Sequence, residues 1–131
     1  MVITDSIGDL IIQLKNGNRV GKESVVLPAS NLKEAVANAL MRAGFVKSVL
    51  RNKKNLRSLE IELAYTSDKS PKINEVQRIS KPSRRIYQNS KEIKTVKNGF
   101  GVAIISTPNG ILTNKEAVKQ KVGGEIMFKI W

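Results

Sequence analysis

The hydrophobic residues of this chain change their spacing several times, and these changes limit the folds open to it. A helical spacing runs over Ile7–Leu14 and again over Leu32–Ala43. Strict alternation, typical of a half-buried strand, runs over Leu59–Tyr65. Short β-branched runs at Glu23–Leu27 and Phe45–Leu50 separate these segments. The first half of the chain is therefore expected to have the order α-β-α-β-β.

Capping residues set the expected ends of the two helices. Thr4 or Asp5 can cap the first helix, and Gly17 stands where a helix end favours a left-handed residue. Ser30 can cap the second helix, and Gly44 is expected to end it. The second helix should turn one apolar face to a core, and the residues on that face are Leu32, Val36, Ala39, Leu40 and Ala43.

The second half of the chain is predicted to be mostly β. A polar segment, 67–72, is interpreted as a junction between a lobe of residues 1–66 and a lobe of residues 73–131. Thr113 and Glu116 form a capping box for a short helix that ends near Lys121. The strands expected in this lobe are Ile73–Ser80, Val102–Ser106, Gly110–Leu112 and Ile126–Trp131. The predicted fold class is α+β with two small lobes, the C-terminal one β-rich with one short helix.

The chain of 131 residues contains neither cysteine nor histidine. Disulfides, thiol nucleophiles, imidazole triads and metal sites built on these ligands are therefore excluded. We expect no metal and no cofactor. No apolar run is long enough to span a membrane, and Asp5, Asp9 and Lys15 interrupt the first apolar stretch, so we expect no signal peptide.

The charge of the chain indicates an anionic partner. Lys and Arg number 23 and Asp and Glu number 11, which gives a net charge of +12. Residues 71–131 hold 12 basic and 4 acidic groups, whereas residues 1–70 hold 11 and 7. Nucleic acid, an anionic membrane face and an acidic protein all fit such a charge. Phosphate contacts are expected first in the more basic second half.

One turn in the basic lobe combines hydroxyls with turn residues. Pro108, Asn109 and Gly110 suffice for an ordinary turn, because proline presets its first corner. Ser106 and Thr107 stand just before it and offer hydroxyls that can bond phosphate oxygens, ribose hydroxyls or base edges. Serine and threonine also favour plain turns, so an RNA contact and a structural turn both remain open.

A basic segment precedes Tyr87. Lys81, Arg84 and Arg85 lie close together around Pro82, and Tyr87 offers a ring for stacking beside guanidinium groups. A solvated charged loop is the alternative, and the charge of the lobe favours nucleic acid. A second basic set contains Lys53 and Lys54 at a predicted hairpin tip, where solvation is equally plausible.

Over nearly its whole length the chain resembles the universal small-subunit ribosomal protein S-eight family, in its bacterial or organellar form. The resemblance begins with Thr4–Leu10 and continues through Arg78–Pro82. It is most specific in Asn98–Thr107 together with Gly110, and it closes with Gly123–Glu125 and Trp131. The order of these motifs is more specific than any one of them.

The resemblance implies a structural protein of the small ribosomal subunit that binds the central domain of its ribosomal RNA and aids platform assembly and translation. The partners implied are that RNA and neighbouring small-subunit proteins, with no membrane and no small-molecule substrate. The location implied is the ribosome in the cytoplasm, and an organelle-encoded ribosome fits equally well. The RNA-binding residues that follow from the resemblance and the charge pattern are Ser106, Thr107, Pro108, Asn109, Gly110, Tyr87, Arg85, Arg84, Lys81, Gly124, Glu125, Lys53 and Lys54.

Three positions depart from the family pattern. Pro108 replaces the usual serine, which removes one hydroxyl and stiffens the turn. Ser83 stands where the family usually has glycine, and Ser6 where it usually has proline. Glu125 is unusual as an RNA contact because carboxylate and phosphate repel; it can accept from a base amine or a 2′-hydroxyl, orient a basic side chain, or simply hold the last strand by an ion pair.

Two other function classes remain open at the level of sequence. An enzyme acting on a phosphorylated substrate is disfavoured by the absence of histidine and by scattered carboxylates such as Glu60 and Glu62. We therefore expect no catalytic residues. A basic adaptor that docks on another polyanion or on an acidic protein would explain the charge and predicts little preference for folded ribosomal RNA.

Overall fold

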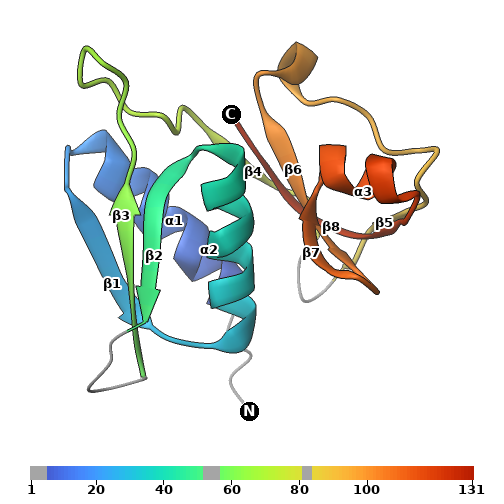
Figure 1. Ribbon diagram of the computed structural model, residues 1–131, viewed down its shortest axis with the longest axis horizontal. Coiled ribbons are helices and arrows are strands. Elements are labelled where there is room, and N and C mark those ends of the chain that lie inside the picture. The colour runs from blue at the N-terminus through green and yellow to red at the C-terminus, as the bar shows by residue number, and fades with distance from the viewer. Residues whose placement is uncertain (1–5, 52–56, 81–83) are drawn as a thin grey trace. The chain divides into compact units, whose positions relative to one another are not determined.

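The computed structural model describes residues 6–51, 57–80 and 84–131, and the chain divides into two compact units (Figure 1). One unit spans Ser6–Asn74 and the other contains Glu75–Trp131. The described part holds three α-helices and two antiparallel sheets. The predicted α+β class is confirmed, as are the α-β-α-β-β order of the first half and the β-rich second half with one short helix.

The first unit is a three-stranded sheet with two helices packed against it. Its elements are α1 (Ser6–Arg19), β1 (Ser24–Pro28), α2 (Asn31–Ala43), β2 (Val46–Arg51) and β3 (Ser58–Leu63), with the strand order β1-β3-β2. Leu59, Ile61 and Leu63 are buried and Glu60 is exposed, as the alternation of this strand predicted. The sheet buries this face beneath α1 and α2.

The caps of α2 are confirmed, but two predictions about the helices are wrong. The Ser30 side chain accepts a hydrogen bond from the Lys33 N–H, and Gly44 adopts a left-handed φ of +88° at the other end. Gly17 does not end α1, which continues to Arg19. A Cβ at Gly17 would lie 2.8 Å from a methyl of Val25, so close packing rather than helix termination explains this glycine. Leu32 is 42% exposed rather than part of the core face.

Residues 64–73 form a loop of the first unit, and the buried side chain of Asn18 anchors both of its ends. The Asn18 side chain, fully buried, donates to the Ala64 carbonyl at 3.1 Å and accepts from the Ile73 N–H at 2.9 Å. Tyr65 and Pro71 pair as an isolated bridge. These contacts satisfy the backbone groups of a polar segment that lacks regular structure.

The second unit is built around its last strand. Its elements are β4 (Val76–Arg78), β5 (Tyr87–Gln88), a 3₁₀ turn η1 (Lys97–Gly99), β6 (Val102–Thr107), β7 (Gly110–Thr113), α3 (Asn114–Gln120) and β8 (Gly124–Ile130). The strand order is β4-β8-β6-β7, and β5 also pairs with β8. The capping box of Thr113 and Glu116 is confirmed. Ile105, Leu112 and Ile126 pack with Ala117 of α3 in one core cluster.

Two strand predictions in this unit are corrected, and one strand was not predicted. The predicted strand Ile73–Ser80 is reduced to Val76–Arg78. Before it, the Ile73 N–H is taken by the Asn18 side chain, and after it the Ile79 and Ser80 N–H groups both donate to the Met127 carbonyl, which breaks the regular ladder. β8 begins at Gly124 rather than at Ile126. The two-residue strand β5 is too short to produce an alternating pattern, and the sequence did not predict it.

Candidate nucleic-acid interface

The turn between β6 and β7 is held together by the Thr107 hydroxyl. This hydroxyl donates to the Gly110 carbonyl at 2.8 Å and accepts from the Asn109 N–H at 3.1 Å. Gly110 adopts a φ of +106°, a conformation that side chains other than hydrogen rarely tolerate. Thr107 therefore already uses its only donor inside the turn.

Asn109 ties the same turn to the end of α3. Its side-chain amide donates to Oε1 of Gln120 at 3.1 Å. Pro108 and Asn109 are both exposed. Gln120 was not predicted as a site residue, because nothing in the sequence around the end of a short helix indicates a contact with a turn 11 residues earlier. The turn is fixed from within by Thr107 and from outside by Gln120.

Three predicted site residues form a row across the sheet at this end. Ser106 of β6 is opposite Glu125 of β8, and Glu125 is in turn opposite Tyr87 of β5. Directly opposite residues of antiparallel strands project from the same face. Ser106, Glu125 and Tyr87 therefore share one face, while Ile105 and Ile126 project from the other. Tyr87 is 66% exposed, and the described residues offer no hydrogen-bond partner to the Ser106 hydroxyl.

Arg85 completes the row through an ion pair. Its Nη1 donates to Oε1 of Glu125 at 2.9 Å. The Arg85 side chain is 59% exposed and the Glu125 side chain only 15%. The hydrogen bond and the charge of Glu125 raise the pKa of Arg85 further above its ordinary value, so the guanidinium stays charged. Of the roles left open for Glu125, the structure contains the pairing with a basic side chain.

Gly123 and Gly124 allow the backbones of three segments to meet beneath this row. A Cβ at Gly124 would lie 2.0 Å from the Ser106 carbonyl oxygen, and a Cβ at Gly123 would lie 2.4 Å from the Gln88 carbonyl oxygen. Real Cβ atoms do not approach other atoms so closely. The distance between the Ser106 and Tyr87 strands is therefore set by two residues that carry no side chain. Gly124 was predicted as a site residue and Gly123 was not.

A buried serine closes the base of the basic loop that carries Arg84 and Arg85. The Ser80 hydroxyl accepts from the Ile86 N–H at 2.9 Å and donates to the Ile86 carbonyl at 3.3 Å. Ser80 is 3% exposed, so both of its bonds are shielded from water. In the sequence Ser80 stands out only as part of the family motif, because a serine before Lys-Pro gives no sign that it closes a loop.

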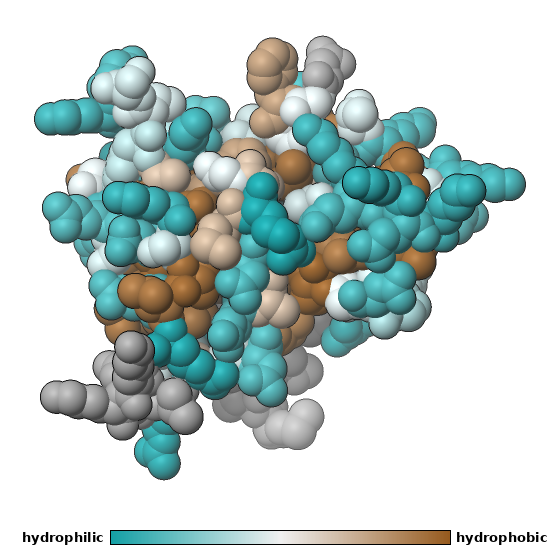
Figure 2. All heavy atoms as spheres, in the orientation of Figure 1, coloured by the Kyte–Doolittle hydropathy of each residue, from teal (hydrophilic) through white to brown (hydrophobic). Residues whose placement is uncertain are grey.

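Of the four remaining predicted site residues, the structure describes only Arg84. Arg84 is exposed at the edge of the loop. Lys81, Lys53 and Lys54 lie outside the described residues. In the view of Figure 2, hydrophilic residues cover much of the surface of the Glu75–Trp131 unit.

The described part of the chain contains neither a candidate metal site nor a candidate membrane span. Residues 6–51, 57–80 and 84–131 contain no group of three or more acidic side chains placed to hold a metal ion. No helix within these ranges is long and apolar enough to cross a membrane.

Comparison with known proteins identifies the family of this chain. The family model described as Ribosomal protein S8 matches residues 5–131. A relative from Oceanobacillus iheyensis is 43% identical over 134 residues, and one from Erythrobacter litoralis is 42% identical over 132 residues. A third, from Borreliella burgdorferi, is 39% identical over 132 residues. Each alignment covers 100% of this chain and of the relative, and each relative is named Small ribosomal subunit protein uS8.

The fold, the charge and these similarities together define the class of this chain, which is a ribosomal protein. More closely, the chain belongs to the ribosomal protein S8 family, a family of structural components of the small ribosomal subunit. The resemblance predicted from the sequence motifs is confirmed.

Proposed function

We propose that this chain is a primary binder of the central domain of small-subunit ribosomal RNA and that the Glu75–Trp131 unit supplies most of the specific contacts. The observation that supports this most strongly is the row of Ser106, Glu125 and Tyr87 beside the rigid β6–β7 turn. A hydroxyl without a partner among the described residues, an exposed ring and a fixed guanidinium stand together on one face. RNA is recognised by such groups at unstacked bases and at ribose hydroxyls.

Affinity and specificity come from different residues in this proposal. Lysines and arginines release counterions from RNA phosphates, a contribution that would bind any RNA. Ser106 donates a hydrogen bond to a base edge or a ribose, and Tyr87 packs against a base or a sugar. Glu125 orients Arg85 rather than meeting the RNA itself, because its carboxylate is mostly covered and already paired. The arrangement needs no movement of the turn on binding.

The other predicted contacts extend this interface. The exposed backbone and side chain of the Pro108–Asn109 corner can meet the RNA beside Ser106. Arg84, Lys81, Lys53 and Lys54 are proposed to contact phosphates, since each is a cation on or near a predicted loop.

We further propose that the chain acts in the cytoplasmic ribosome beside neighbouring small-subunit proteins and without catalysing a reaction. The S8 family is structural rather than enzymatic, which supports this. Assembly with RNA and proteins, not turnover of a substrate, is then the whole of its activity.

A footprint of the purified chain on small-subunit ribosomal RNA tests the proposal, with excess random RNA as competitor. Protection of a discrete segment in the central domain that survives the competitor is the expected result. If random RNA or another polyanion removes the protection at equal mass, the chain is a general basic adaptor and the proposal fails.

A further inference from the structure

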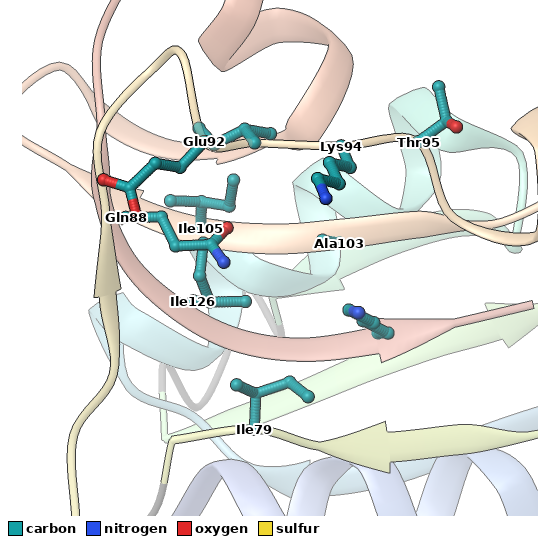
Figure 3. A pocket seen from close by; sticks show the side chains of 10 residues that line it. Ile79, Gln88, Glu92, Lys94, Thr95, Ala103, Ile105 and Ile126 are labelled. Atoms are coloured by element: carbon teal, nitrogen blue, oxygen red, sulfur yellow. The ribbon is translucent and has the colours of Figure 1, made fainter.

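A cavity of about 200 Å³ lies in the second unit, between the sheet and the loop that follows β5 (Figure 3). Its floor contains Ile105 and Ile126, which are 0% and 3% exposed, together with Ala103. Its rim contains the exposed residues Glu92 and Lys94. The cavity is smaller than the roughly 300–1,000 Å³ of pockets for drug-sized ligands. It can hold one flat ring system.

This cavity is distinct from the proposed ribosomal RNA contact. Gln88 lines it, and Gln88 directly follows Tyr87 in β5, so the two side chains project from opposite faces. Ile105 and Ile126 likewise alternate with Ser106 and Glu125. The cavity and the row therefore lie on opposite faces of one sheet.

Hydrogen bonds hold the loop above the cavity in place. The Asn89 side-chain oxygen accepts from the N–H groups of Lys91 and Glu92, both at 3.0 Å. Further along, the amide of Asn114, which is 2% exposed, donates to the Lys94 carbonyl at 3.2 Å. The loop is thus anchored on both sides of Ile93. These hydrogen bonds hold the loop in one position, which lowers the cost of ordering it on binding.

The chemistry of the lining fits a nucleotide. The half-buried Ile79 and Ile93 provide an apolar surface for the face of a ring, and the buried Ile105 and Ile126 close the cavity beneath it. Figure 3 shows the amide of Gln88 and the amino group of Lys94 pointing toward the space above the sheet. Gln88 can donate to and accept from a base edge. Lys94 and the half-buried Lys129 provide cations for a phosphate.

Glu92 adds a preference among bases. One of its carboxylate oxygens accepts from the Asn89 N–H at 3.3 Å, next to Gln88. The other oxygen remains as an acceptor, and it favours a base that carries an exocyclic amine.

We propose that this cavity binds a nucleotide with an amino-bearing base, its ring on the isoleucines and its phosphate at Lys94 and Lys129. The nucleotide can be free or can belong to an RNA strand.

Methyl NMR of the full-length chain tests this directly, since the four isoleucines of the cavity are the reporters. Adenosine monophosphate is expected to shift the δ1 methyl signals of Ile79, Ile93, Ile105 and Ile126 through the ring current of the base. The methyls of Ile7 and Ile61 in the other unit serve as internal controls and are expected to stay in place. Ribose 5-phosphate, which lacks the base, should leave all of them unchanged. Uridine monophosphate should bind more weakly than adenosine monophosphate.

Two charge variants locate the phosphate. Lys129→Met should weaken binding of adenosine monophosphate about tenfold, the effect of losing a charged hydrogen bond. Lys119→Met removes the same charge from an exposed position on α3 and should leave this binding unchanged. If Lys129→Met does not fold, Lys94→Met at the exposed rim replaces it with the same expectation.

The source of the nucleotide is settled by a second titration with a single-stranded oligoadenylate. Shifts with the oligoadenylate as well as the mononucleotide assign the cavity to RNA, and shifts with the mononucleotide alone assign it to a free nucleotide. The proposal is overturned if neither probe shifts the four methyls or if ribose 5-phosphate shifts them equally. Equal weakening by Lys119→Met also overturns it. The footprint on ribosomal RNA is independent of each of these results, because it reports the opposite face.

Discussion

Ser106 and Thr107 differ in where the hydrogen of each hydroxyl goes, and this separates their roles. Thr107 donates to Gly110 and accepts from Asn109, whereas no described residue takes the Ser106 hydrogen. Two neighbouring residues that both carry hydroxyls can therefore have different roles. Thr107 contributes to the folding stability of the turn, and Ser106 contributes to the free energy of RNA binding.

Alanine at each position separates the two roles. Ser106→Ala should lower the affinity for cognate RNA by about 1 kcal/mol and leave the free energy of unfolding within about 0.5 kcal/mol. Thr107→Ala should lower the free energy of unfolding by about 1–2 kcal/mol, because the Asn109 N–H and the Gly110 carbonyl lose their partner, and should affect cognate affinity only through the loosened turn. Denaturant unfolding and filter binding measure the two quantities. Equal weakening of cognate and random RNA would remove Ser106 and Thr107 from specificity.

Arg85 contributes through its charge. Arg85→Ala should weaken binding to every RNA and reduce the slope of log affinity against log salt by about one phosphate contact. Ser106→Ala is the matched control, since it removes no charge and should leave the slope unchanged. Binding isotherms at several salt concentrations give both slopes. A slope that does not respond to Arg85→Ala places this guanidinium away from the phosphate backbone. The Arg85–Glu125 pair itself is expected to add little to folding stability, because the Arg85 side chain is 59% exposed.

At the scale of elements, the two glycines before β8 control the spacing of the interface. Gly124→Ala places a methyl group 2.0 Å from the Ser106 carbonyl oxygen, so β6 and β8 must separate. We expect a loss of about 1–3 kcal/mol in the free energy of unfolding and a loss of preference for cognate RNA. Thermal unfolding and competition binding measure these effects.

Gly21→Ala is the control for this substitution. Gly21 has a φ of +83° with no atom within 4 Å of an added Cβ, so alanine there strains the backbone without displacing a strand. It should lower stability and leave RNA preference intact. If Gly124→Ala retains full preference for cognate RNA, the spacing set by the glycines does not matter for recognition.

The elements with a strong local signal were predictable from sequence. The Ser30 and Gly44 caps, the capping box at Thr113 and the alternation of β3 each depend on residues close together in the chain. The elements that were missed depend on distant partners. β5 exists only because β8 pairs with it, and Asn18, which takes the Ile73 N–H, limits how far β4 extends toward the N-terminus.

In the candidate site, too, the features that depend on local sequence were predictable and those that depend on distant partners were not. The residue types at Ser106, Tyr87 and Glu125 were identified from the turn chemistry, the charge and the family resemblance. Their alignment in one row follows from the register of three strands, and no local pattern predicts a register. Ser80, Gln120 and Gly123 were missed because each acts on a segment that is remote in sequence or has no characteristic residue type.

For the whole molecule, the net charge of +12 predicts strong salt dependence of RNA binding. If neutral groups supply the specificity, cognate and random RNA should lose affinity in parallel as salt rises from about 50 to 200 mM, each by about a thousandfold for some six phosphate contacts. The ratio of the two affinities should stay nearly constant. Titrations of both RNAs across this range measure it. A ratio that falls toward one with rising salt would mean that charge, not the hydroxyl and the ring, distinguishes the RNAs.

The bare backbone at Gly123 and Gly124 also limits how this corner can evolve. Any replacement at either position adds at least one carbon atom where a neighbouring carbonyl oxygen already stands. New preferences for RNA therefore have to arise at neighbouring positions that tolerate a different side chain. Pro108, at the exposed tip of the hairpin, is such a position.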